Sequence, residues 1–170
     1  MEFCEVVRRR RSIRAYTDEG IDPSVLDRLL RLVSRAPSAG NLQAYRIVVV
    51  RSPDRRSALA AAAEDQRFLA EAPVDLVFFA DPDRSAGKYG RRGASLYAIQ
   101  DATIAATFAV LAAAAEGLAT VWVGAFDESA VRTVCGVTKI RPVAIVALGH
   151  GAEDPPESPR RDLKEMVGVR

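Results

Sequence analysis

The spacing of apolar residues predicts two helices near the start of the chain. In the stretch IDPSVLDRLLRLVSRAP, apolar side chains recur every three or four residues and form one helical stripe. Asp22 can cap this helix, Pro23 suits its first turn, and Pro37 follows its end. A shorter apolar face predicts a first helix that ends in arginines. Its apolar residues are Phe3, Val6 and Val7, and Arg10 shares the same helical face.

The remaining pattern alternates between buried strands and helices. The segments RIVVV, APVDLVFFA, ATVWV and PVAIVALG are short apolar runs typical of buried strands. Ser52 and Pro53 mark a helix start, and a long alanine-rich helix runs from about residue 95 to 116 and ends at Gly117. Asp127 caps a short helix in DESAVRTVCG, whereas the polar, glycine-containing DPDRSAGKYGRRG predicts a mobile loop.

This order of elements predicts an α+β fold in one domain, residues 1–170, with helices on both faces of a sheet of four or so strands. At least two helices precede the first strand, and the GxGxxG turn of a dinucleotide-binding fold is absent from the sequence. A plain alternating dinucleotide fold is therefore excluded.

Positive charge is concentrated near the start of the chain rather than spread along it. The net charge of the chain is +2, yet five arginines fall within the seven residues from Arg8 to Arg14. Such a run can be a solvated helix end, a nucleic-acid patch, or a compact phosphate site in which RRS-x-R supplies guanidinium and hydroxyl donors. A capped helix follows almost at once, which favours a single phosphate over a nucleic-acid track. We therefore expect no nucleic-acid partner, while the phosphate site and the solvated helix end both stay open.

The remaining composition indicates a cytoplasmic protein that does not enter a membrane. The longest apolar run is rich in alanine and is bounded by Asp101 and Glu116, which is typical of a buried helix. Cys4 and Cys135 offer no metal spacing and are expected as reduced thiols, although one disulfide between them stays open. The single histidine, His150, excludes mechanisms that need two, including those of most zinc hydrolases.

Two further stretches have a composition that suits a flat ligand. The loop PSAGNLQ joins small residues, which allow close backbone approach, to the amides of Asn41 and Gln43. The strand in ATVWVGAF ends at Gly124. The alternatives are an ordinary turn for the loop, and a glycine-ended strand with a core tryptophan, Trp122.

Together these stretches resemble the nitroreductase family of FMN-dependent oxidoreductases. The similarity lies in RRRRSIRAYTDEGI, RAPSAGNLQAYRIVVV, EAPVDLVFFAD, QDATIAATFAVLAAAAEGLATVWVGAF, PVAIVALGHGAE and SPRRDLKEMV, which occur in the family's order. The resemblance implies a nitroreductase-like fold with a central mixed or antiparallel sheet. It also implies an intertwined homodimer with FMN at the subunit interface, and a C-terminal MVGVR that adds a strand to the partner's sheet.

The resemblance further implies which residues hold the cofactor. The flavin phosphate would be held by the segment that matches R-R-S-x-R and by a basic residue in PRRDL. These residues are Arg10, Arg11, Ser12, Arg14 and Arg161, with Arg160 as the alternative to Arg161. Arg8 and Arg9 precede the motif and are expected on the surface.

The loop after the second helix would contact the flavin from the other subunit. Its matching residues are Pro37, Ser38, Ala39 and Asn41, with Gln43 beside the ring. Val123 and Gly124 would lie next to the isoalloxazine through their backbone. No side chain is expected as a catalytic acid, because solvent can protonate many products.

The chemistry implied is a ping-pong transfer of two electrons from NADH or NADPH to an electron-poor small molecule, such as a nitroaromatic compound or a quinone. Family alternatives are enone reductases, dehalogenases, azoline dehydrogenases and an enzyme that breaks up flavin; a non-catalytic flavin binder also stays open. Two features depart from the family pattern. Residues 81–95 are brief where larger members carry a helical insert, and WVGAF lacks the acidic residue of well-known bacterial members.

Overall fold

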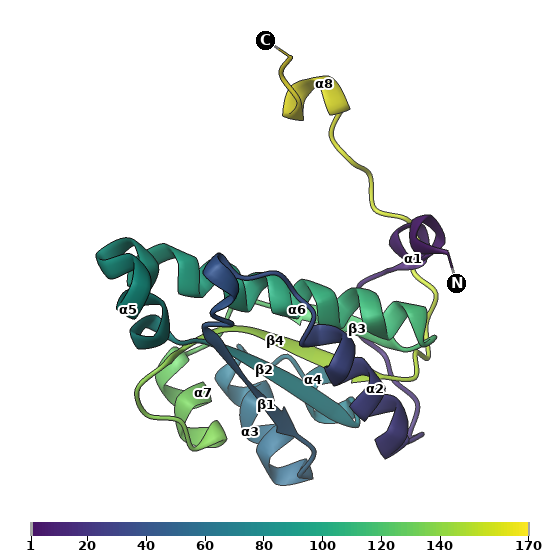
Figure 1. The fold of residues 1–170 in the computed structure, drawn as a ribbon. Helices are drawn as coiled ribbons and strands as arrows, with labels where there is room; N and C mark the ends of the chain where they lie inside the picture. The colour runs from purple at the N-terminus through teal and green to yellow at the C-terminus, as the bar shows by residue number, and fades with distance from the viewer. Residues whose placement is uncertain (1, 170) are drawn as a thin grey trace.

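The computed structural model describes residues 2–169, and its centre is a four-stranded sheet in the order β1-β2-β4-β3 (Figure 1). Every neighbouring pair is antiparallel, so of the two sheet types expected the antiparallel one is observed. The strands are β1 (Tyr45–Val50), β2 (Val74–Ala80), β3 (Ala119–Val123) and β4 (Arg141–Gly149). The α+β class and the four apolar runs proposed as strands are thus confirmed.

The two inner strands form the buried centre of the molecule. All seven residues of β2 are buried, as are most of those in β4. Side chains alternate between two apolar clusters, so that Phe78 faces one layer of helices and Phe79 the other. The continuous apolar runs in the sequence follow from this coverage on both faces.

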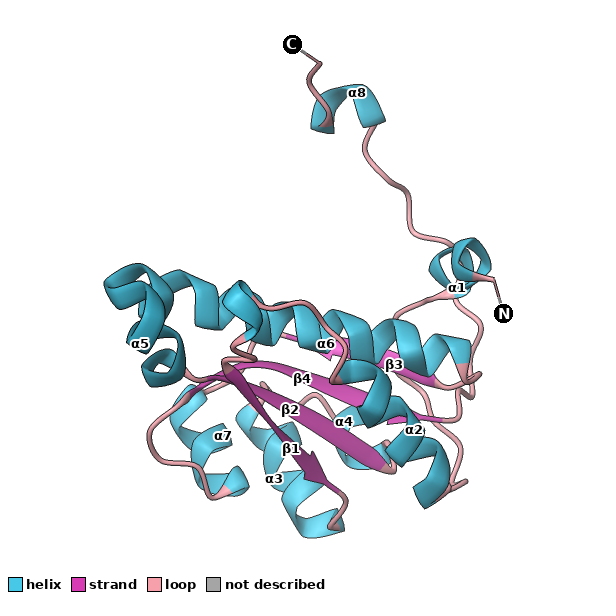
Figure 2. Ribbon diagram, in the orientation of Figure 1, coloured by secondary structure: helices cyan, strands magenta, loops and turns pink. Residues whose placement is uncertain are grey.

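One face of the sheet is covered by α6 (Ala98–Ala115) with α2 (Pro23–Val33) beside it (Figure 2). Alanines dominate the buried side of α6, and their small side chains let the helix lie close to the strands. In α2, the Asp22 carboxylate accepts a hydrogen bond from the Ser24 N–H at 2.7 Å, and Pro23 occupies the first turn. The cap expected from the sequence is confirmed.

The opposite face is covered by α3 (Pro53–Ala62), α4 (Phe68–Glu71) and α7 (Glu128–Cys135). Helix α3 begins at Pro53 as expected, but the Ser52 hydroxyl accepts no capping hydrogen bond from the described residues. Cys135 is buried at the end of α7, and burial raises the pKa of its thiol to about 11. Cys4 is exposed and both thiols are free, so the disulfide alternative is wrong.

The prediction of a mobile loop after β2 is wrong, because this segment folds as α5 (Pro82–Arg92). The Asp81 carboxylate caps the helix by accepting a hydrogen bond from the Arg84 N–H at 3.1 Å, and Pro82 fills the first turn. Gly90 has a positive φ and turns the chain, which continues through the π-helical turn η2 (Gly93–Tyr97) into α6. The Asp81-Pro82 helix start therefore determines the structure of this segment, although its glycines disfavour a helix.

The N-terminal segment covers the outer edge of β3. After α1 (Phe3–Arg9), Ser12 forms a parallel bridge with Thr120, and the Ile13 N–H donates to the Thr120 carbonyl at 2.9 Å. The arginine run thus lies at the end of the first helix, as expected. A pairing partner on an edge strand occupies backbone groups that would otherwise be open.

The C-terminal segment leaves the body as an arm that carries α8 (Leu163–Met166) (Figure 1). Its apolar side chains stay exposed, and Val169 is 94% exposed. The others are Leu163, Met166 and Val167.

By length and composition, one helical run, Pro82–Ala115, could cross a membrane. In this fold its α6 part packs against the sheet, and nine residues of α6 are buried. It serves as the central helix of the core.

A buried carboxylate lies in β2 on the side of α3. Asp75 is 0% exposed and neither of its carboxylate oxygens has a hydrogen-bond partner within residues 2–169. Burial raises its pKa well above the ordinary value of 3.8, and the nearby Arg56 guanidinium opposes this shift only in part. Asp75 in turn contributes to the raised pKa of Tyr16 and of Cys135.

This arrangement makes the contribution of Asp75 to the stability of the wild type fall with increasing pH. Because the folded pKa lies above the unfolded one, the contribution of Asp75 is fully present below about pH 4 and is lost as pH rises through the folded pKa. Asp75→Asn should therefore exceed the wild type in free energy of unfolding at neutral pH, with a smaller gap at acid pH. Urea titrations between pH 5 and 8 measure this, with exposed Asp27→Asn as control. A gap that does not change with pH would contradict the prediction.

Candidate functional site

The N-terminal arginine motif and the edge strand β3 enclose a cavity of about 230 Å³. Arg10 and Ser12 line it together with Trp122 of β3, and the opposite wall is formed by α6. The α6 residues are Thr107, Val110 and Leu111. Among the described residues that line the cavity, Arg10 is the only charged one. A guanidinium and a hydroxyl in a partly apolar cavity suit a phosphate group.

A second hollow, of about 360 Å³, is also lined by Arg10. Arg9 and Arg11 line it, but so do the carboxylates of Glu153 and Asp154. Acidic side chains next to the arginines repel an anion. The cavity shared by Ser12 and Trp122 is therefore the better phosphate site.

The other two arginines of the motif, Arg11 and Arg14, do not line this cavity. The Arg11 guanidinium donates to the carbonyls of Arg8 and Arg10 and lies 3.7 Å from the Glu157 carboxylate. Arg14 is exposed, and its backbone N–H donates to the Glu153 carboxylate. Only Arg10 and Ser12 of the predicted phosphate residues thus line the cavity.

Residues Val123 and Gly124 lie at the end of β3, directly after Trp122. Val123 is buried in the core, whereas Gly124 is exposed. Trp122 is 36% exposed, so the alternative of a core tryptophan is wrong. Its indole Nε1 is 3.7 Å from the position that a Cβ would take on Gly124. The backbone of Gly124 is therefore open to a ligand and lies beside the indole.

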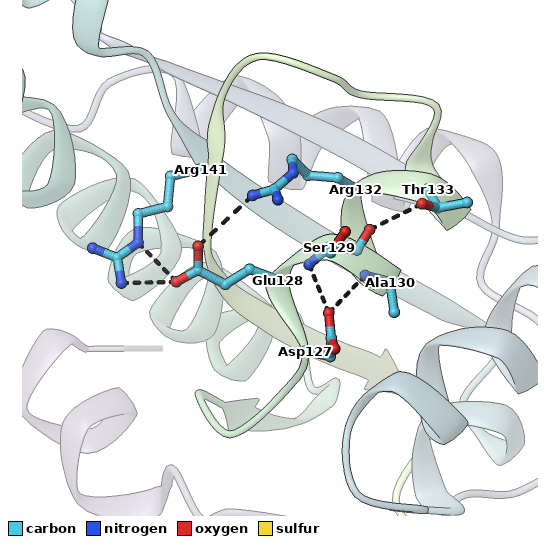
Figure 3. A network of polar contacts seen from close by, with 7 residues as sticks. All are labelled: Asp127, Glu128, Ser129, Ala130, Arg132, Thr133 and Arg141. Atoms are coloured by element: carbon cyan, nitrogen blue, oxygen red, sulfur yellow. Dashed lines mark hydrogen bonds and ion pairs between the residues drawn. The ribbon is translucent and has the colours of Figure 1, made fainter.

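The turn after Gly124 is fixed by hydrogen bonds at the start of α7 (Figure 3). The Asp127 carboxylate accepts from the N–H groups of Ser129 and Ala130 at 2.7 and 2.8 Å, which confirms the predicted cap. The Asp127 N–H donates to the Ala62 carbonyl at 2.8 Å, and Glu128 pairs with Arg141 at 2.7 Å. These contacts hold the end of β3 in place.

The loop between α2 and β1 has an unusual backbone. Asn41 and Gln43 both have positive φ values, 57° and 48°, next to Gly40 at 56°. Asn and Gly accept this conformation more readily than other residues, and strained loop residues are frequent at binding sites. The Gln43 amide donates to the carbonyl and the side-chain oxygen of Asn41 at 2.7 and 3.0 Å, and its backbone N–H donates to the Ser38 hydroxyl at 2.9 Å. The two amides thus stabilise the loop itself.

Sequence reasoning did not identify Asp101 as the residue that holds this loop. Asp101 lies on α6 and is 1% exposed. Its carboxylate accepts hydrogen bonds from the N–H of Ala39 at 2.9 Å and from that of Ala44 at 3.3 Å. The available signal was a single acid in an otherwise apolar helix, because a buried carboxylate requires donors.

A single chain does not bring all the predicted residues together. The loop with Pro37, Ser38 and Ala39 precedes β1, one edge of the sheet, and Gly124 follows β3, the other edge. Three strand spacings separate these edges, about 14 Å. Arg161 is exposed and precedes α8 on the arm, which stands away from the body (Figure 1).

Metal and histidine chemistry find no support in residues 2–169. No group of three or more His, Cys, Asp or Glu side chains in that range could hold a metal ion. His150 directly follows β4 and is partly exposed, and its Nε2 lies 3.7 Å from the Glu19 carboxylate.

The role of Asp101 can be tested by its removal. Asp101→Ala leaves two backbone N–H groups without their acceptor, so we expect the free energy of unfolding to fall by about 2–4 kcal/mol. Asp101→Asn keeps one acceptor oxygen and should lose less. Urea unfolding measures both changes. Exposed Asp27→Ala is the control, since it breaks only a surface pair with Arg31. An Asp101→Ala variant as stable as this control would contradict the role.

Comparison with known proteins agrees with the resemblance seen in the sequence. The sequence profile described as Nitroreductase family matches residues 7–66 and 60–150. The chain is 33% identical to a protein of Thermus thermophilus named NADH dehydrogenase, over 94% of this chain and 91% of that protein. It is 30% identical to FMN reductase [NAD(P)H] of Bacillus subtilis, over 94% of this chain and 70% of that protein.

The fold is also similar to solved structures. Nitroreductase A from Vibrio parahaemolyticus superposes with a TM-score of 0.90 at 28% identity, covering 99% of this chain and 75% of that one. A protein from Streptococcus pneumoniae described by the same family term superposes with the same TM-score at 24% identity, over 99% of this chain and all of that one.

Proposed function

Because the chain belongs to the nitroreductase family, we propose that it is an oxidoreductase that uses FMN to pass two electrons from NADH or NADPH to an electron-poor small molecule, such as a nitroaromatic compound or a quinone. The observation that supports this most directly is the cavity at β3. Its Arg10 and Ser12 suit a phosphate, and the exposed backbone of Gly124 lies beyond Trp122 on the same strand.

The position of the loop supports a homodimer. The Pro37–Asn41 residues assigned to the flavin precede β1, whereas the cavity lies at β3, and these two edge strands are about 14 Å apart. A second copy of the chain can bring its loop to the cavity of the first copy, and the first copy can bring its loop to the cavity of the second. Each of two sites would then be built from both chains.

The residues divide into groups by their role. Arg10 and Ser12 bind the phosphate, and Arg14 and Arg161 add positive charge from exposed positions. The Arg11 guanidinium supports the turn through its hydrogen bonds to backbone carbonyls. Pro37, Ser38 and Ala39 of the second copy cover the ring, with Asn41 and Gln43 rigidifying that loop. When bound, the FMN supplies the redox chemistry.

The Gly124 N–H and the nearby positive charge would stabilise negative charge on the reduced cofactor. Val123 sets the position of that N–H because its side chain is buried in the core. With no protein acid assigned, protons reach the product from solvent. NAD(P)H and the acceptor would occupy one position in turn, which gives ping-pong kinetics.

The purified protein tests this proposal directly. It should absorb in the visible range as a flavoprotein and oxidise NADH or NADPH when a nitroarene or quinone is supplied. Anaerobic assays with enones, halogenated aromatics and azolines separate the family alternatives. A protein that does not bind added FMN would overturn the proposal. A protein that binds FMN but does not oxidise NADH or NADPH would be a non-catalytic flavin binder.

The phosphate assignment gives a prediction for Arg10. Arg10→Ala should weaken FMN binding by about 1.5–3 kcal/mol, because it removes a hydrogen bond to a charged group. Arg14→Ala should have a loss in the same range if that side chain reaches the phosphate. Arg9→Ala is the matched control, since Arg9 is exposed and pairs with Glu5 at 3.3 Å. Fluorescence titration with FMN measures all three. Equal affinity of the Arg10 variant and the wild type would contradict the assignment.

The exposed arm gives a prediction for the dimer. Its apolar side chains have no cover in one chain, so we expect the arm to pack on a second copy. Removal of residues 167–170, of which 170 lies outside the described range, should lower the melting temperature and shift the size-exclusion profile toward a single chain. An unchanged profile and melting temperature would remove this role.

A further inference from the structure

Trp122 has a position that its residue type does not usually take. It is the one tryptophan of the chain, it lies on an edge strand, and it is 36% exposed. Its neighbours on the strand, Val121 and Val123, face the helix layer of α3, α4 and α7, so Trp122 faces the other side of the sheet, toward α6. An indole of this size is normally placed where its N–H finds a partner.

The indole lies between the two ends of the candidate cofactor site. It lines the cavity with Arg10 and Ser12, and its Nε1 is 3.7 Å from the position of a Cβ on Gly124. Ser12 is bridged to Thr120, and Gly124 is four residues further along, about 13 Å. A ligand that extends from the Arg10 guanidinium to the Gly124 backbone must therefore pass Trp122.

The indole N–H is a polar group of the β3 wall that remains available, as does the hydroxyl of Thr120 deeper in the strand. The Thr107 hydroxyl on the opposite wall donates to the Thr103 carbonyl at 2.9 Å. Among the hydrogen bonds of residues 2–169, none uses the Trp122 N–H as donor. An indole N–H can only donate, so the group that pairs with it must be an acceptor.

We propose that the Trp122 indole N–H donates a hydrogen bond to the ring of the bound FMN and thereby tunes its reduction potential. This inference rests on the proposed function. Reduction adds negative charge to the ring, and a hydrogen bond to a charged acceptor is about twice as strong as one to a neutral acceptor. Trp122 thus stabilises the reduced cofactor more than the oxidised one and raises the potential. It is a tuning residue, separate from the Gly124 N–H.

The test is the midpoint potential of the FMN in Trp122→Phe, measured by equilibration with a reference dye. Phenylalanine keeps a flat aromatic side chain but has no N–H. We expect the preference of the protein for reduced over oxidised FMN to fall about tenfold, which corresponds to about 30 mV for a two-electron couple. Trp122→His, which can restore a donor, should recover part of the shift.

Thr133→Val is the control, because it removes a donor whose hydrogen bond to Ser129 stays within α7. Its potential should equal that of the wild type. A Trp122→Phe variant that binds FMN with the wild-type potential would overturn the proposal. A wild type that binds no FMN would instead be the failure of the proposed function.

A second measurement needs no variant. Since the chain has one tryptophan, the NMR spectrum of its N–H groups contains one indole N–H resonance. We expect this resonance to move downfield on FMN binding, to move further on reduction, and to exchange more slowly with water. A resonance with the same shift and exchange rate in the free, oxidised and reduced protein would overturn the proposal even if Trp122→Phe does not fold.

Discussion

The close packing of α6 on the sheet is the constraint on which the other parts of the molecule depend. Alanines along α6 let the helix backbone approach the strands, and they leave little room for adjustment. Two parts of the helix serve different parts of the candidate site. Asp101 near its start holds the loop before β1, while Thr107, Val110 and Leu111 form a wall of the cavity at β3. One rigid element therefore sets the distance between the two half-sites.

Two buried carboxylates show how differently the fold uses charge. Asp101 accepts two backbone hydrogen bonds, so its burial orders a loop. Asp75 is equally buried but has no hydrogen-bond partner within the described residues, so its burial raises its pKa. The Asp101 carboxylate supports the site. The Asp75 carboxylate lowers the free energy of unfolding at neutral pH, and the surrounding core tolerates this loss.

Local sequence signals predicted the elements well where one interaction decides the structure. The Asp22-Pro23 and Asp127 starts were found because capping needs only neighbouring residues. The same signal is present at Asp81-Pro82, but the glycines that follow led to the prediction of a loop. In the structure, the cap and the contacts of α5 decide that the segment is helical. The arginine motif indicated phosphate chemistry, but sequence adjacency could not show that Arg10 lines the cavity while Arg11 turns back to the carbonyls of its own segment.

Features that depend on distant parts of the chain could not be predicted in this way. The contact between Asp101 and Ala39 joins residues 62 positions apart, and the exposure of Trp122 follows from the place of β3 at the sheet edge. The resemblance to a family supplied the expectation that a loop from a second chain completes the site. In one chain, the loop precedes the edge strand β1 and Gly124 follows the other edge strand, β3. Under the proposed function, a second copy of the chain would supply the loop.

That separation has a genetic consequence under the proposed arrangement. A chain damaged at Arg10 keeps a sound loop, and a chain damaged in the loop keeps a sound arginine motif. Mixed assemblies of two such defective chains would contain one fully intact site and one carrying both lesions. Two inactive alleles of this gene could therefore complement each other when expressed in the same cell.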